Sequence, residues 1–493
     1  MKRLLRMFLS RTSLISLLLM LQIALFFVII YFLSGVPYVS IGLYVISTLI
    51  VLYLVYREEN PIYKMSWIIP ILVFPLFGGL FYLFYRSINI SNSVKQKFME
   101  IEISRGSYLP LPSESTEKAS RYLDRYYWPT YQHTDITFLD SGEVLFEDLK
   151  KELMLAKSFI LLEFFIISPG KMWSDILSIL KKKVAAGVKI QLIYDDFGSY
   201  KLPFKYPKQL KEFGIEAYQF NRMRMHINFA MNYRDHRKIV VIDNNIAFTG
   251  GTNVGDEYIN LEHPFGHWQD AGIKLKGEAV WSLTVAFLQT LHFITNQQPD
   301  YESYHLPADH LKSHGYVTPF TDGPINGELV TKNVYLSLIT QAEKEILITT
   351  PYLIIDYELS EALKLAIKSG VKVRIVIPNT PDKKFVYMVT ETYANELFSA
   401  GVDIYRYKPG FIHSKMMIID RKHAFIGTAN FDFRSLYLHF ENNVYLSETP
   451  VIDDMVDYMR SVVKQSELME DLKHRNIFYR LAQFIMRGFA TLM

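Results

Sequence analysis

The first part of the chain is dominated by uncharged, hydrophobic residues. No charged residue occurs between positions 12 and 56, a run too long for one membrane-spanning helix and about right for two joined by a tight turn. The sequence Ser-Gly-Val-Pro at 34–37 supplies the turn. The pattern therefore predicts spans near 13–33 and 38–56, with a cleaved signal peptide as the alternative for the first.

A third uncharged segment follows the second predicted span. Residues 65–85 are long enough to cross a membrane, but Pro70, Pro75 and the glycine pair at 78–79 interrupt them. Such residues permit a kinked span, predicted at about 66–85, or a re-entrant segment sheltered by protein. Basic residues before the first segment and after the third both favour the cytoplasmic side, so the membrane face that carries the rest of the chain stays open.

Beyond about residue 135, hydrophobic strands alternate with amphipathic helices, twice in the same order. This alternation predicts an α/β fold with a mostly parallel sheet flanked by helices. Gly187 and Gly370 end corresponding helices, and Gly214 and Gly401 open corresponding strands, which indicates a duplicated unit. The predicted elements are helices at 142–156 and 173–186 with strands at 159–167 and 189–194, then helices at 328–342 and 357–369 with strands at 346–349 and 372–376.

These patterns divide the chain into five predicted regions. They are a membrane region at 1–86, a linker at 87–135 that partly packs on the lobes after it, a first lobe at 136–300, a second lobe at 301–460 and a C-terminal amphipathic helical tail at 461–493.

Two further segments combine cations with apolar residues. The first half has about ten extra residues before its motif, and this segment, 222–231, is either a loop at the level of lipid headgroups or an ordinary charged surface loop. The basic amphipathic helix predicted at 477–493 is either interfacial or packed on the body of the protein.

One short pattern occurs twice, each time on a predicted strand (239–242 and 416–419) and the turn after it. Its five positions, in the order His, Lys, Asp, Gly and Asn, recur at a single offset of 177 residues, which chance does not explain. We therefore predict that the two copies form the active site. The first copy is His236, Lys238, Asp243, Gly250 and Asn253, and the second is His413, Lys415, Asp420, Gly427 and Asn430.

Two H-x-K-x4-D-x6-G-x2-N motifs in one chain resemble the phospholipase D superfamily. The N-terminal hydrophobic hairpin and the run Asn-Phe-Asp-Phe-Arg-Ser at 430–435 narrow the resemblance to bacterial cardiolipin synthases, and it covers nearly the whole chain. The resemblance implies duplicated phospholipase D-like α/β/α lobes related by a pseudo-two-fold, preceded by N-terminal transmembrane helices. Such packing would bring both histidines into one shared site, with one site per lobe as the alternative.

The residue types suit phosphoryl transfer by double displacement. One histidine attacks the phosphorus atom, and the other protonates the leaving oxygen and later activates the incoming alcohol. Lys238 and Lys415 would hold the non-bridging oxygens. The two motif asparagines, with backbone N–H groups at the glycine turns, would bind the same oxygens, unless they only cap their turns. Asp243 and Asp420 are predicted to act as turn residues that orient the lysines, with a direct catalytic role as the alternative.

The resemblance adds roles that spacing alone does not give. It implies that an acid downstream of each motif orients an imidazole, and the matching residues are Asp270 and Glu441. It also implies that His236 is the nucleophile and His413 the acid/base. Thr428 stands where the superfamily commonly has Ser, but it retains the hydroxyl, so we count it among the substrate-binding residues.

Composition and missing motifs limit the partners and cofactors that the sequence predicts. The chain has 493 residues, 50% of them hydrophobic, and a net charge of +3, which is too small to indicate nucleic acid as a partner. It has no cysteine and no H-E-x-x-H motif, so a metal site is not predicted. It also has no P-loop, which fits the exchange of one phosphodiester for another without a nucleotide cofactor.

The predicted function is that of a multi-pass cardiolipin synthase of the plasma membrane. It would transfer a phosphatidyl group between two phosphatidylglycerol molecules, giving cardiolipin and glycerol through a phosphohistidine. The choice of phosphatidylglycerol as acceptor rests on the resemblance. A membrane-anchored phospholipase D-type hydrolase, or a transferase with another alcohol acceptor, is the first alternative, while a nuclease and a lipid-binding scaffold are weaker ones.

Overall fold

The computed structural model describes residues 37–58, 61–75, 78–80, 82–83, 92–110, 117–222, 233–309, 311, 313–325, 327–470 and 476–492, with scattered residues between 20 and 35. It divides into two units, which are described separately: residues 1–94 with 222–233, and residues 95–221 with 234–491. Most of the predicted span at 13–33, and residues 223–231 of the predicted headgroup-level loop, lie outside the described residues.

In the N-terminal unit, two apolar helices pack against each other. Helix α3 (Pro37–Tyr56) contacts α4 (Pro61–Val73) through Ile50, Leu54, Trp67 and Ile71. The Ser47 hydroxyl donates a hydrogen bond to the carbonyl oxygen of Pro75, beyond the end of α4. Pro70 lies within α4, where it has no N–H to donate, and its carbonyl accepts a hydrogen bond from Phe74 N–H at 2.9 Å.

Among the described residues, one helix is long and apolar enough to cross a membrane, at Tyr38–Tyr56. It matches the predicted span at 38–56. Three spans were predicted, and the other two are not found in the described part of the chain. Helix α4 ends at Val73, inside the predicted third span, where the prolines and glycines anticipated a break.

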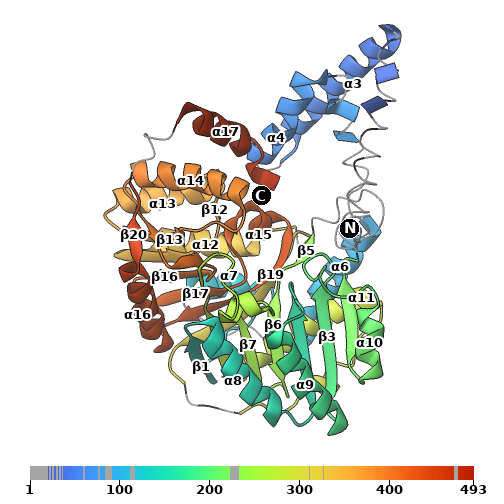
Figure 1. Cartoon of the computed structure of the whole chain (residues 1–493), viewed down its shortest axis with the longest axis vertical. Coiled ribbons are helices and arrows are strands. Elements are labelled where there is room, and N and C mark those ends of the chain that lie inside the picture. Colours follow the sequence, from blue (N-terminus) through green and yellow to red (C-terminus); the bar gives the residue numbers. More distant parts are fainter. Residues whose placement is uncertain are drawn as a thin grey trace, which may run out of the picture. The chain divides into compact units, whose positions relative to one another are not determined.

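The second unit contains two sheets with matching strand orders (Figure 1). The first runs β1-β9-β7-β6-β2-β3-β4, and the second runs β10-β19-β17-β16-β11-β13-β14-β20, so seven positions correspond one to one and β20 is added at one edge. The duplication predicted from the sequence is therefore present. The first sheet comprises β1 (Thr134–Leu139), β2 (Phe159–Phe164), β3 (Lys189–Asp195), β4 (Glu216–Phe220), β6 (Lys238–Ile242), β7 (Ile246–Gly250) and β9 (Gly272–Gly277). The second comprises β10 (Tyr316–Asp322), β11 (Glu345–Thr349), β13 (Lys372–Pro378), β14 (Asp403–Tyr407), β16 (Met416–Ile419), β17 (His423–Gly427), β19 (His439–Ser447) and β20 (Ser466–Leu468).

Helices cover the sheets and carry the core. On the first sheet, alternate strand residues such as Leu162, Leu192 and Val240 pack with α8 and α9, while α11, buried along most of its length, contacts the strands of the first sheet and β10 of the second. The helices are α6 (Asn92–Ser104), α7 (Lys118–Asp124), α8 (Gly142–Leu155), α9 (Lys171–Ala185), α10 (Tyr206–Glu212), α11 (Val280–Thr295), α12 (Val330–Gln341), α13 (Tyr357–Lys368), α14 (Lys384–Ser399), α15 (Phe433–Tyr437), α16 (Val451–Lys464) and α17 (Ile477–Arg487), with short 3-10 turns at Arg105–Ser107, Asp256–Ile259, Glu302–Tyr304 and Ala490–Leu492.

The sheets are mixed, so the predicted mostly parallel arrangement is wrong. Strands β2, β3 and β4 run parallel to one another, but β6, β7, β9 and β1 are joined by antiparallel pairs. The reason lies in the turn after each motif strand. Asp243 and Asn244 have φ values of 53° and 54°, and Asp420 and Arg421 have 52° and 58°. Such left-handed residues close a tight hairpin, which makes the next strand antiparallel.

The lobes exchange short strands beside each motif. Strand β5 (Arg234–Asp235), just before His236, pairs in parallel with β19 of the second lobe. Strand β15 (Gly410–Ile412), just before His413, pairs in parallel with β8 (His267–Gln269) of the first. A further short pair, within the second lobe, joins β12 (Leu353–Ile354) to β18 (Phe431–Asp432). The exchange is reciprocal, as a pseudo-two-fold relation requires.

The segments before and after the two predicted lobes also pack on the second unit, which is called the catalytic unit below. In the linker region, Phe98 of α6 lies against Phe293 and Phe440, with ring centroids 5.3 and 5.2 Å away. At the other end, position 461 falls within α16, and β20 pairs with β14. The start predicted for the tail is therefore inside a helix of the second lobe.

Candidate active site

The two motif histidines are each held by an acid from the other lobe. His236 Nδ1 lies 2.9 Å from a carboxylate oxygen of Glu441, and His413 Nδ1 lies 2.7 Å from one of Asp270. The backbone repeats the exchange, since His236 N–H donates to Phe440 O and His413 N–H donates to Gln269 O. Both acids are fully buried. The structure thus brings the predicted histidines and the predicted acids together, in crossed pairs.

Burial sets the protonation of these pairs. Removal from water lowers the pKa of His413 to about 4 and that of His236 well below its usual value. Burial alone would raise the pKa of Glu441 and Asp270, but the adjacent imidazoles hold both below the ordinary carboxyl range. The imidazoles are therefore neutral beside ionised acids. Each Nδ1 carries the proton that its acid accepts, which leaves the Nε2 lone pair available.

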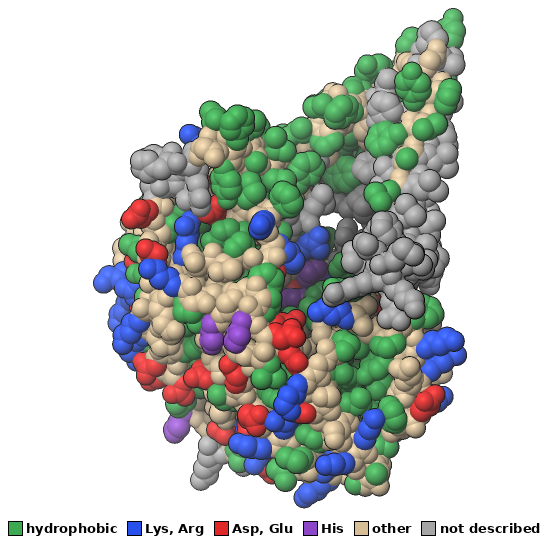
Figure 2. Space-filling model, viewed as in Figure 1, with side chains coloured by type: hydrophobic (Ala, Val, Ile, Leu, Met, Phe, Trp, Pro, Cys, Tyr) green, Lys and Arg blue, Asp and Glu red, His purple; other side chains and the backbone are tan. Residues whose placement is uncertain are grey.

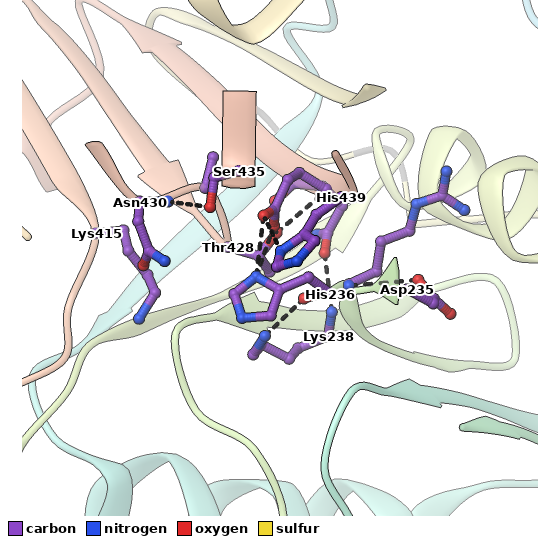
Figure 3. Close-up of polar contacts among 12 residues, drawn as sticks. Asp235, His236, Lys238, Lys415, Thr428, Asn430, Ser435 and His439 are labelled. Atoms are coloured by element: carbon purple, nitrogen blue, oxygen red, sulfur yellow. Dashed lines mark hydrogen bonds and ion pairs between the residues drawn. The ribbon is translucent and has the colours of Figure 1, made fainter. Parts of the chain in front are cut away.

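The two motif lysines lie beside the histidines. The Nζ of Lys238 donates to the carbonyl oxygen of His236 at 2.6 Å, and Lys415 makes the equivalent bond to His413. Burial lowers the pKa of Lys238 to about 8 and that of Lys415 to about 7. Each lysine interacts electrostatically with Asp270 and Glu441, and Lys238 contributes to lowering the pKa of His413. These interactions across the lobes favour one shared site. Figure 3 shows His236 and Lys238 of the first lobe with Thr428 and His439 of the second.

Asp243 and Asp420 serve the turns. The carboxylate of Asp243 accepts hydrogen bonds at 2.7–2.8 Å from the backbone N–H groups of residues 157–159, and Asp420 does the same for residues 343–345. The predicted turn role fits this geometry. The predicted orientation of the lysines does not, because Lys238 and Lys415 bond to the histidine carbonyls instead.

The remaining predicted residues shape the turns after the motif strands. Asn253 uses both polar side-chain atoms within the protein, accepting from Ile166 N–H after β2 and donating to the Tyr258 hydroxyl. Asn430 donates to Asp432, while its buried Oδ1 has no hydrogen-bond partner among the described residues. The Thr428 hydroxyl donates to Glu441. Phosphate binding by the two asparagines stays a prediction.

Two of the glycines allow close packing of backbone. A Cβ on Gly250 would lie 2.5 Å from the carbonyl oxygen of Ala271, and the φ of Gly250 is 149°. A Cβ on Gly427 would lie 2.4 Å from the Asn443 side chain. The backbone next to each downstream acid therefore runs directly beside the end of the motif hairpin.

His439 is a site residue that was not predicted. Its ring lies beside that of His236, with centroids 5.3 Å apart, and its Nδ1 is 3.7 Å from a Glu441 oxygen (Figure 3). By its place in the strand pairing, His439 corresponds to Trp268 of the first lobe, whose ring is tilted against that of His413 with centroids 5.0 Å apart. The only signal in the sequence was its place two residues before Glu441.

Asn442 and a buried charge cluster were also missed. Asn442 Oδ1 accepts from the backbone N–H of Lys238, and its Nδ2 donates to Thr249 Oγ1, linking the lobes behind His236. Beneath the same motif, Glu163 and Asp235 lie near Arg237, and burial raises the pKa of both acids. Glu163 stands within a hydrophobic strand, where a single acid gave little sequence signal.

One group of potential metal ligands occurs in the described part of the chain. A ligand atom from each of His236, His439 and Glu441 lies within 4.8 Å of the others. Two of these three residues already form the His236–Glu441 pair. The absence of a metal cofactor, predicted from the motif chemistry, stays a prediction.

Comparison with known proteins gives the family. The model of the cardiolipin synthase PLD-like domain matches residues 149–265 and 335–463, one segment in each lobe, and that of the phospholipase D-nuclease N-terminal region matches 42–86. A cardiolipin synthase of Halalkalibacterium halodurans is 33% identical over 457 residues, covering 89% of this chain and 90% of that protein. One of a Geobacillus species is 34% identical over 454 residues, with the same coverage. The chain belongs to the cardiolipin synthase family.

It is accordingly an enzyme of the phosphatidyltransferase type, as the sequence predicted. Among solved structures, the phosphatidylserine synthase of Haemophilus influenzae superposes with a TM-score of 0.57 at 13% identity, covering 80% of this chain and 98% of that one. At that identity the likeness shows the fold alone. Membership of the cardiolipin synthase family and the apolar α3 together indicate association with a membrane.

Proposed function

We propose that this member of the cardiolipin synthase family makes cardiolipin from two molecules of phosphatidylglycerol, with release of glycerol. The observation that carries the proposal is the crossed pairing of His236 with Glu441 and of His413 with Asp270. Two neutral imidazoles, each oriented by an ionised acid from the other lobe, suit a reaction that needs one nucleophile and one proton carrier.

In the first step, His236 Nε2 attacks the phosphorus atom of the donor. The bond from phosphorus to the glycerol oxygen breaks, and His413 gives that oxygen a proton, so glycerol leaves and a phosphatidyl group remains on His236. The pKa of His413 is low in the free enzyme, but the charge of a bound phosphodiester favours its protonation. The placement of the nucleophile at His236 follows the resemblance of the motifs.

In the second step, His413 takes the proton from a glycerol hydroxyl of the acceptor phosphatidylglycerol. The freed oxygen attacks phosphorus, the phosphorus–nitrogen bond breaks, and His236 returns to its starting form with cardiolipin as product. Lys238 and Lys415 neutralise charge on the non-bridging oxygens in both steps. The same number of phosphodiester bonds is made as broken, so no nucleotide is consumed.

The decisive experiment supplies purified full-length protein with phosphatidylglycerol as the only lipid. We expect glycerol and a four-chain lipid in equal amounts, and neither from His236→Ala or His413→Ala. Phosphatidic acid as the main product would replace the synthase with a phospholipase D-type hydrolase. A phospholipid carrying a new headgroup, formed only when another alcohol is added, would make the enzyme a transferase of different acceptor specificity.

We also propose that the chain is a multi-pass protein of the plasma membrane. The length and composition of α3 and the uncharged character of 13–33 and 66–85 support this proposal. A reporter fused after Met493 that is active only outside the cytoplasm will give the side on which the catalytic unit lies. A chain released from membranes by alkaline carbonate would contradict membrane insertion.

A further inference from the structure

Helix α17 is packed on the protein by its polar face. The Tyr479 hydroxyl donates to Glu391, Gln483 Nε2 donates to Met388 O at 3.2 Å, and Arg487 pairs with Glu396, all three partners lying on α14. The Asn476 side chain caps the start of the helix by accepting from Tyr479 N–H at 2.8 Å. These bonds fix which side of α17 faces the second lobe.

The opposite face of α17 is a continuous apolar surface that points away from the protein. Figure 2 shows hydrophobic side chains gathered over this helix. They are Ile477, Phe478, Leu481, Phe484 and Ile485, between 52% and 80% exposed, followed by Phe489 at 47%. An amphipathic helix on a water-exposed surface ordinarily buries its apolar side. The reversed orientation of α17 therefore requires another apolar phase on its outer side.

Exposed cations lie on both of the helices that meet here, α17 and α14. Arg480 is exposed on α17, and the exposed Lys383 and Lys384 stand at the start of α14, next to Phe385, which is 67% exposed. An apolar face with phenylalanines, accompanied by lysine and arginine, matches the interface of a bilayer that contains anionic lipid.

The start of α14 also connects to the catalytic site. The Tyr352 hydroxyl donates to Asp382 at 2.5 Å and accepts from Lys383 at 3.2 Å. The Tyr352 ring packs beside the cluster of Tyr258, Trp268 and Phe411, which surrounds His413. A lipid surface at α14 and α17 would thus lie at one end of a chain of aromatic contacts that ends at a motif histidine.

We propose that the outer face of α17, with Phe385 of α14, rests in the interfacial layer of an anionic bilayer and places the catalytic unit where lipid headgroups reach the site. This contact is made by the catalytic unit itself, in addition to the N-terminal helices. Its catalytic consequence rests on the proposed function, while the contact itself does not.

The first test uses the absence of cysteine from the chain. Single-cysteine variants Phe484→Cys and Ile477→Cys of the full-length protein are labelled with a nitroxide and reconstituted in vesicles of phosphatidylcholine and phosphatidylglycerol. We expect both labels to be accessible to oxygen and protected from a water-soluble nickel relaxant. The matched control is Leu155→Cys, at the end of α8 in the first lobe, where the side chain is 67% exposed.

Two results would overturn the proposal. One is a Phe484 label as accessible to the nickel relaxant as the Leu155 label. The other is strong spin–spin broadening at Phe484 that persists in lipid-free detergent, which would assign the face to a second copy of this chain.

The second test separates the contact from the chemistry. In the variant Phe478→Ser/Phe484→Ser, we expect kcat/KM for phosphatidylglycerol in vesicles to fall about tenfold, because interfacial binding scales with buried apolar area. Activity on dihexanoyl phosphatidylglycerol below its micelle concentration should equal that of the wild type. Equal loss on both substrates would overturn the proposal. If the wild type forms no cardiolipin while the labels remain in lipid, the proposed function fails and the contact stands.

Discussion

Lys238 and Lys415 are buried cations that carry no fixed partner acid within hydrogen-bond reach in the described contacts, only a histidine carbonyl each. Burial lowers their pKa values to about 8 and about 7. Each loses its charge as the pH rises through its pKa, so the free enzyme binds an anionic phosphodiester best below about pH 7. Once the phosphodiester is bound, its charge raises both pKa values again.

We therefore expect kcat/KM for phosphatidylglycerol to fall on the alkaline side from about pH 7, while kcat falls only at higher pH. The two profiles differ because kcat/KM reports the free enzyme and kcat the enzyme–substrate complex. Measuring both from initial rates across neutral and alkaline pH checks this expectation. A kcat/KM that stays constant up to about pH 9 would show that neither lysine has the lowered pKa that its burial implies.

At the scale of single residues, the sequence predicted most of the site. The constant offset between motifs identified the histidines and lysines, and the resemblance identified Asp270 and Glu441. The sequence could not predict that each acid bonds to the histidine of the other lobe, because this pairing depends on how the two folded lobes pack together. The sequence also did not identify His439, because its place two residues before Glu441 is matched in the first lobe by Trp268 and not by a second histidine.

The hairpin after each motif strand ties the motif to the backbone at the start of the neighbouring strand. Asp243 caps it by accepting three backbone hydrogen bonds from the turn before β2, and Asp420 does so before β11. Both residues belong to the repeated motif, but they act on the backbone and not on the reacting atoms.

We expect Asp243→Ala or Asp420→Ala to lower the free energy of unfolding by about 2–3 kcal/mol, as loss of several charge-assisted hydrogen bonds does. In the fraction that folds, kcat should stay within about threefold of the wild type, since no contact with Lys238 or Lys415 is lost. Heat-denaturation midpoints and initial rates on the same samples check both parts. The contrast is Glu441→Gln, where stability should change less and kcat should fall by at least about a hundredfold.

Element positions were predictable where periodicity was strong, as for α8 and α13, which lie within a residue or so of the ranges predicted. The direction of the strands was not. Alternating strands and helices suggest parallel pairing, but the left-handed Asp243 and Asn244 turn the chain straight back. Apolar helix α11 was missed because a helix buried on nearly every side has no polar face to reveal its period.

At the scale of the whole molecule, the crossed acids make the two lobes depend on each other. If His236 is the nucleophile, Glu441 of the second lobe governs formation of the phosphoenzyme. Asp270 of the first lobe then governs the proton carried by His413. The two acids are equivalent by pseudo-symmetry, yet loss of Glu441 should impair formation of the phosphatidyl-enzyme, whereas loss of Asp270 should impair both its formation and its release.

Acid quenching with labelled phosphatidylglycerol tests this order. We expect Asp270→Asn to slow both formation and release of the phosphatidyl-enzyme, since His413 moves the proton in both steps, and Glu441→Gln to reduce its formation by about a hundredfold or more. Peptide mapping locates the label. Label on His413 in the wild type, with the effects of the two acids exchanged, would reverse the roles of the histidines.

The reciprocal strand exchange also bears on how such a chain arises. Neither half contains both members of a histidine–acid pair. A separate half would therefore have to associate with a second copy before it could catalyse a reaction. Two identical halves would form a single centre with identical sides. Once the halves are fused into one polypeptide, the residues on the two sides of the centre can become different. Trp268 and His439, which occupy the same position in the two halves, are the visible mark of that divergence beside otherwise matched histidines.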